Sequence, residues 1–255
     1  LAIHRATDGN PLFIVNLVDF LVAQGVLAEV DGQWRLCKSV QEVTRGVPES
    51  LRQLIEKHIE RLSEEQQRLL EIASVVGREF SAATVAASLD ASIEQVEEWC
   101  EGLVKRGQFL QAAGPSVLPD GTIAGRYGFL HTLYQAVLYE RAPEIRRMRL
   151  HRRVGDNEER LYGSRANEIA AELAVHFERG QDAPRAVKYL QLAAENALKR
   201  HAHREAITYF TRAVALATSV DTSQVVVVGG GSMALPAAMA AQDRRVRALA
   251  LLSPD

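Results

Sequence analysis

Apolar and polar positions along this chain follow a helical period over most of its length. One clear example runs from Leu51 to Leu62, where apolar residues recur every three or four positions and therefore share one helix face. His58 lies on that face, and we interpret it as a histidine packed in the core. Serines in positions typical of helix N-caps predict further helix starts at Ser63, Ser81 and Ser92.

Short strands are expected at two places. The segment "GVLAEVDGQWRL" has two apolar runs around Asp31-Gly32, a dipeptide typical of two-residue hairpin turns. Farther along, "QFLQAAG" and "GRYGFLH" flank a loop that contains proline, glycine and aspartate. Because this second pair follows three expected helices, the order matches a winged-helix domain, which we expect at residues 46–142.

From Tyr134 to Ala217 the pattern is helical almost throughout. A set of small and aromatic residues recurs there at an offset of 20 residues: Ala186, Tyr189, Leu190 and Ala193 return as Ala206, Tyr209, Phe210 and Ala213. The second helix of a TPR unit has such a pattern, although a regular array repeats at about 34 residues. We therefore expect a degenerate, TPR-like α-solenoid arm at 143–220, with the arginines between 146 and 153 as a solvated face.

The last stretch, "VVVVGGGSMALPAAMAAQDRRVRALALLSPD", predicts a short β-α-β fragment at 221–255. Ser232 stands in a Gly-x-Ser-x-Ala sequence that resembles the nucleophile elbow of α/β-hydrolases, with the Met233 amide as an oxyanion donor. No acid and histidine pair follows Ser232, so we expect an incomplete triad. A purely structural turn and a dinucleotide-binding turn remain alternatives. The latter would use Gly229, Gly231, Ala234 and Asp255.

Composition narrows the classes of function. The 255 residues carry a net charge of −2, with 47% apolar and 24% charged residues, which is ordinary for a globular protein and gives no support to a basic nucleic-acid binder. No apolar run reaches the roughly 20 residues that span a bilayer. Cys37 and Cys100 have neither metal-ligand nor disulfide spacing and are expected to be packing residues. We expect a cytoplasmic protein with no membrane partner and no metal site, and both ends suggest a piece of a longer protein.

Several stretches together resemble one family. They are "DGNPLFIVNLVDFLVAQGVL", "VPESLRQLIEKHIERLSEEQQRLLEIASVVGREF", "YGFLHTLYQAVLYE" and the arm from "ELAVHFERG" onward. In this order they are similar to one half of the STAND signalling NTPases, which are AAA-related ATPases. It is the half that follows the nucleotide-binding core. The resemblance implies a mainly α fold: a lid helix and hairpin at 1–45, a winged helix, and a helical arm. It also implies ATP or ADP in the parent protein, held by a core absent here.

Two residues match nucleotide contacts of that family. Pro11, in "GNP", corresponds to the lid proline that packs near the adenine base. His131, in "LHT", resembles the histidine of the Met-His-Asp motif that senses the β-phosphate of ADP, although Leu130 and Thr132 replace its neighbours. Each has a plainer alternative: Pro11 as a helix start, and His131 as a partly buried histidine at a strand end.

The expected function is therefore regulatory. The chain has no G-x-x-x-x-G-K-[ST] phosphate loop, so we expect no bound nucleotide and no ATPase activity from it alone. The implied partners are the missing ATPase core and a protein held by the TPR-like arm. One alternative is a serine α/β-hydrolase fragment fused to a helical regulatory region, with Ser232 as nucleophile. A DNA-binding regulator is the other, but its recognition helix, Ser92–Gly107, carries more acidic than basic residues, so phosphates would repel it.

Overall fold

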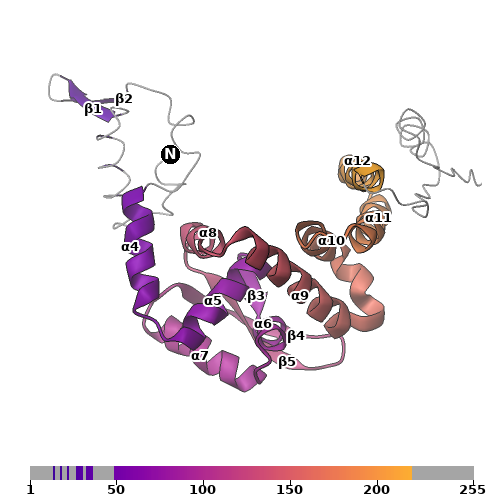
Figure 1. The fold of residues 1–255 in the computed structure, drawn as a ribbon, viewed down its shortest axis with the longest axis horizontal. Helices are drawn as coiled ribbons and strands as arrows, with labels where there is room; N and C mark the ends of the chain where they lie inside the picture. Colours follow the sequence, from indigo (N-terminus) through magenta and orange to yellow (C-terminus); the bar gives the residue numbers. More distant parts are fainter. Residues whose placement is uncertain are drawn as a thin grey trace, which may run out of the picture. The chain divides into compact units, whose positions relative to one another are not determined.

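The computed structural model describes residues 49–219 and, before them, residues 27–30 and 33–36 with Ile14, Val18 and Val22. This part is mainly helical, with a small three-stranded sheet and a separate hairpin (Figure 1). It divides into two compact units. The first comprises the described residues up to Pro115 together with Gly125–Pro143, and the second comprises Ser116–Ala124 together with the described residues from Glu144 onward.

The expected N-terminal hairpin is confirmed. Strands β1 (Leu27–Val30) and β2 (Gln33–Leu36) pair antiparallel, with Val30 opposite Gln33. This register leaves two residues between the strands, as the Asp31-Gly32 dipeptide predicts.

Five helices of the first unit begin where the polar and apolar pattern predicts or close to it. They are α4 (Glu49–Glu60), α5 (Glu64–Val76), α6 (Ala82–Leu89), α7 (Ile93–Lys105) and α8 (Thr132–Arg141). The serine caps are confirmed, since Ser63 and Ser92 accept hydrogen bonds from the amides of Gln66 and Gln95 at 3.3 and 3.2 Å. Ser81 accepts from the amide of Ala83 at 3.3 Å, so each serine satisfies a backbone donor that the helix leaves unpaired.

A three-stranded sheet joins these helices. Its strands are β3 (Glu79–Ser81), β4 (Leu110–Val117) and β5 (Ile123–Phe129), in the order β3-β5-β4. Strand β3 pairs antiparallel with β5, with Phe80 opposite Tyr127. Strand β3 was not predicted from the sequence, because three residues are too few for an alternating pattern to appear.

The core of the first unit lies between its helices and this sheet. Its fully buried side chains include Leu69, Leu70, Leu103 and Phe129. Cys100 is buried among them, and burial raises the pKa of its thiol to about 12, with the nearby Glu97 carboxylate adding to the shift. The interpretation of Cys100 as a packing residue is therefore confirmed.

The second unit is a series of helices, which we call the helical arm. It contains α9 (Glu144–Tyr162), a 3-10 segment (Gly163–Ile169), α10 (Ala170–Arg179), α11 (Ala183–Lys199) and α12 (His203–Ser219). The 20-residue offset seen in the sequence equals the spacing between the starts of α11 and α12. Most residues of that pattern are buried, Tyr189 and Ala213 among them, so the pattern marks packing positions. The arginines of α9 mostly face solvent, as expected.

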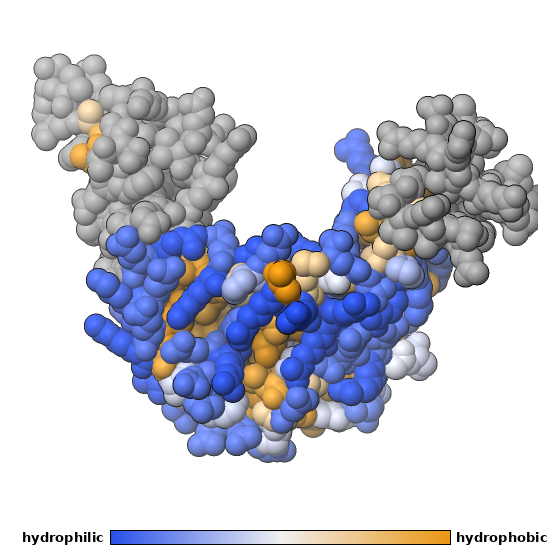
Figure 2. All heavy atoms as spheres, viewed as in Figure 1, coloured by the Kyte–Doolittle hydropathy of each residue, from blue (hydrophilic) through white to orange (hydrophobic). Residues whose placement is uncertain are grey.

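The surface shown in Figure 2 is largely hydrophilic, with hydrophobic residues visible as streaks between hydrophilic ones. Within the described ranges, no helix combines the length and apolar character that crossing a bilayer requires. Several sequence predictions fall outside these ranges and stay predictions: Pro11, Cys37, Ser232, Met233 and the whole β-α-β fragment at 221–255.

Candidate functional site

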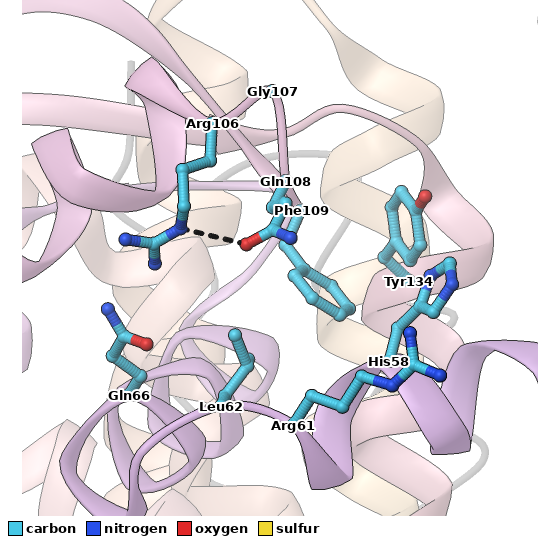
Figure 3. Close-up of a pocket in the computed structure, with 9 residues that line it drawn as sticks. All are labelled: His58, Arg61, Leu62, Gln66, Arg106, Gly107, Gln108, Phe109 and Tyr134. Carbon is cyan, nitrogen blue, oxygen red and sulfur yellow. Dashed lines mark hydrogen bonds between the residues drawn. The ribbon is translucent and has the colours of Figure 1, made fainter.

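A pocket of about 520 Å³ lies within the first unit (Figure 3). We call it the cationic pocket. Its lining residues come from the end of α4, the start of α5, the turn after α7, and α8. They are His58, Arg61, Leu62, Gln66, Arg106, Gly107, Gln108, Phe109 and Tyr134. A volume of this size suits a small organic molecule.

Charge in the cationic pocket has one sign. Two of the described lining residues are arginines, His58 adds an imidazole, and none of the lining residues that the structure describes is acidic. Arg106 donates from Nε to the Gln108 side-chain oxygen at 3.0 Å, which holds one edge of its guanidinium group. Among the residues that the structure describes, the side chains of Arg61 and His58 make no hydrogen bond or ion pair. Unpaired cations around a concave surface raise its positive potential and attract anions.

The wall formed by the turn after α7 has an unusual backbone. Gly107 and Phe109 both have positive φ, 61° and 60°, and the Leu110 amide donates to the Gln108 carbonyl at 2.6 Å. Positive φ is ordinary for glycine but costs about 1–3 kcal/mol for a bulky residue. The Phe109 ring compensates by burial against Tyr134, with ring centroids 4.8 Å apart. The turn is thereby fixed at the pocket wall.

His58 differs from its predicted role. Its place on the apolar face of the helix predicts a packed core histidine, but its side chain is only half-buried and lines the pocket. The apolar face of α4 is confirmed at Ile55 and Ile59, each 1% exposed. His58 lies in the last turn of the same helix, beside Ile59, and its side chain lines the cavity.

His131 lies at the junction between β5 and α8. Its ring is buried, and its Nδ1 accepts the backbone amide of Leu133 at 3.0 Å, so His131 is the N-cap of α8. An accepting Nδ1 assigns the proton of a neutral ring to Nε2. A donor at Nε2 suits a phosphate oxygen. The match of His131 to a nucleotide contact is untested by this geometry and stays a prediction, as does that of Pro11.

A second cluster of titratable residues is buried in the helical arm, between α9 and α10. His151 and His176 approach with their Nδ1 atoms 3.1 Å apart, and His176 Nε2 lies 3.7 Å from Glu158 Oε2. Burial lowers the pKa of His151 to about 3 and that of His176 to about 4. Burial raises the pKa of Glu158 to about 8, with Glu172 adding to the shift. At neutral pH these three groups are therefore uncharged.

Gly155 lets the helices approach there, because an added Cβ would lie 3.0 Å from the Phe177 ring.

Ion pairs join α9 to α11 in what we call the arm network. Arg185 Nη1 lies 2.5 Å from Asp156 and 3.3 Å from Glu159, and Arg185 also pairs with Asp182 at 2.8 Å. Asp182 caps α11 and accepts a further bond from Arg152 at 3.1 Å. Burial acts to raise the pKa of Asp182, but the bonds from Arg185 outweigh it and hold that pKa below its usual value.

Comparisons add no relative to these observations: no protein-family model, no curated protein and no solved structure matches the chain. In the described ranges, no group of three or more histidine, cysteine, aspartate or glutamate residues could hold a metal ion. The cationic pocket was missed by sequence reasoning, since its described walls come from three separated stretches of the sequence: 58–66, 106–109 and Tyr134. A hint was present in the basic residues that follow two acidic helices, at Arg61 and Arg106.

Proposed function

We propose that this chain is a regulatory module of a STAND-type ATP-binding signalling protein, which couples the nucleotide state of an ATPase core to a protein partner. The observation that carries the proposal is the order of the first unit. Helix α5, strand β3, helices α6 and α7, and the β4-β5 hairpin follow one another, with β3 at the edge of β5. This order supports a winged-helix assignment, and the paired helices after it support a TPR-like arm.

His131 is the residue through which nucleotide would act. It joins strand β5 to the first turn of α8, so a new hydrogen bond to its ring would act directly on the junction between the sheet and that helix. With Nδ1 occupied by the Leu133 amide, Nε2–H is the group that would donate to the β-phosphate of ADP. Such a bond is charge-assisted and would favour the closed, ADP-bound state of the parent protein. The arm would then present its surface to the protein partner.

The cap role and the nucleotide role of His131 can be separated by substitution. Asparagine is a good N-cap, so His131→Asn keeps an acceptor for the Leu133 amide but removes the imidazole. We expect His131→Asn, tested together with the ATPase core, to weaken ADP affinity about tenfold. The control His201→Asn, in the exposed turn before α12, should leave ADP affinity unchanged. Equal ADP affinity in the His131→Asn and unsubstituted proteins, measured by calorimetry, would contradict the proposal.

The DNA-binding alternative is disfavoured by the charge on α7. Glu94, Glu98 and Glu101 are exposed on this helix, which is the one a winged-helix domain would insert into the major groove. Carboxylates at that face repel the phosphate backbone. The hydrolase alternative depends on Ser232, which lies outside the described residues. Fluorophosphonate labelling of the chain tests it, because only an activated serine would react.

A further inference from the structure

We propose that the cationic pocket binds a small phosphate monoester with an apolar or aromatic group. This ligand is separate from the nucleotide of the proposed function, and its site depends on none of the residues matched to nucleotide contacts. The observation behind the proposal is a cavity in one unit that gathers two arginines and a histidine, with no carboxylate among its described lining residues.

The positions of the basic residues favour a ligand held between two walls. His58 and Arg61 lie three residues apart at the end of α4, so their side chains leave the same face of the chain. Arg106 is the C-cap of α7 and comes from the opposite segment of the lining. A single anion between these walls would therefore join the end of α4 to the turn after α7.

A helix dipole accounts for part of this arrangement. Cations are favourable near helix C-termini, and both arginines lie there. The dipole does not require them to face one cavity, nor does it account for the absence of acids among the lining residues that the structure describes. By contrast, the neighbouring Lys105 also lies at the end of α7 but is not a lining residue, and it pairs with Glu101 at 3.4 Å. The difference between Lys105 and Arg106 supports a ligand role for the arginine.

The chemistry of the lining selects the ligand class. Guanidinium groups bind phosphate and carboxylate oxygens through two parallel N–H donors. Two permanent cations match the charge of about −1.5 to −2 that a phosphate monoester carries at neutral pH, whereas a single carboxylate carries half of that. Leu62, Phe109 and Tyr134 supply an apolar wall, and Gln66 adds a side-chain amide (Figure 3). Phenyl phosphate combines the two features and fits a volume of about 520 Å³.

Calorimetric titration of the full 255-residue chain with phenyl phosphate tests the proposal. We expect saturable binding, with weaker binding of inorganic phosphate and of benzoate, because each has only part of the ligand chemistry. Arg61→Gln and Arg106→Gln should each weaken phenyl phosphate binding at least about tenfold. Lys105→Gln, which removes a neighbouring cation outside the pocket, should change it less than about twofold.

Three results would overturn the proposal. The first is no heat of binding for phenyl phosphate up to millimolar concentrations. The second is an equal loss of binding in Lys105→Gln and Arg106→Gln, since this would indicate non-specific attraction by surface charge. The third is a phosphotyrosyl peptide binding far more tightly than phenyl phosphate, which would assign the pocket to a protein partner. Both arginines are exposed, so the variants should remain folded, and circular dichroism checks this.

Discussion

The helical arm and the cationic pocket use arginine in opposite ways. In the arm, Arg185 lies among Asp156, Glu159 and Asp182, and its guanidinium carbon stands 4.0 Å from the centre of the Phe177 ring. In the pocket, Arg61 makes no ion pair with any residue that the structure describes. Charge matched by neighbouring acids stabilises the packing of helices, whereas unmatched charge around a cavity is available to a ligand. The arm network is therefore structural and the pocket is a candidate site.

The largest expected effect lies in the core of the arm. Phe177 is fully buried and stacks on Tyr189, with ring centroids 5.6 Å apart. Phe177→Ala should lower the free energy of unfolding by about 4 kcal/mol, because it leaves a cavity between α10 and α11. Urea denaturation measures the change. Ile207→Ala, at an exposed position of α12, should cost less than about 0.5 kcal/mol, and similar losses in both variants would contradict the assigned core.

The arm network gives the next effect. Asp182→Ala removes the N-cap of α11 and two ion pairs from a largely buried position, and should cost about 3 kcal/mol. Asp182→Asn keeps a capping oxygen and should cost about half as much. Chemical denaturation of the two variants separates the cap from the charge. An Asp182→Ala variant as stable as the unsubstituted protein would contradict the claim that the paired arginines of the arm network stabilise the arm.

The buried histidine pair and Glu158 predict a pH dependence. The histidines have pKa values lowered from 6.5, so their contribution to stability is present above pH 6.5 and is lost as the pH falls toward about 4. The pKa of Glu158 is raised from 4.5, so its contribution is lost as the pH rises toward about 8. Stability should therefore be greatest near pH 6.5, where the two trends meet.

Glu158→Gln tests the alkaline part of this profile. Between pH 6.5 and 8 the unsubstituted protein should lose about 1–2 kcal/mol of stability as Glu158 ionises in its buried position. Glutamine cannot ionise, so the variant should show little change over that interval. Unfolding free energies measured at the two pH values decide the matter, and an identical decrease in both proteins would exclude Glu158 as the cause.

The smallest effect on stability is expected in the cationic pocket. Arg61→Gln and Arg106→Gln remove exposed charges without acidic partners among the described residues, so each should change the free energy of unfolding by less than about 0.5 kcal/mol. Thermal unfolding without ligand measures this. A loss of about 2 kcal/mol or more, the scale of breaking a buried interaction, would assign the arginines a structural role.

Local features were the ones that the sequence could predict. The serine caps at Ser63, Ser81 and Ser92 need only a few neighbouring residues, and the two-residue hairpin turn needs even fewer. Features built from distant segments were missed. Strand β3 exists because β5 pairs with it, and the pocket exists because α4, α5, α7 and α8 meet around it. The turn at His201, with φ of 59°, was also missed, since the apolar pattern continues across it.

Hydrogen exchange with phenyl phosphate present tests most directly whether the two regions differ in this way. Added ligand should slow amide exchange in peptides that contain the end of α4 and the turn after α7, around Arg61 and Arg106. Peptides around Asp182 and Arg185 in the arm network should exchange at the same rate with and without ligand. Protection of the arm, or unchanged exchange at both pocket walls under saturating ligand, would contradict the account.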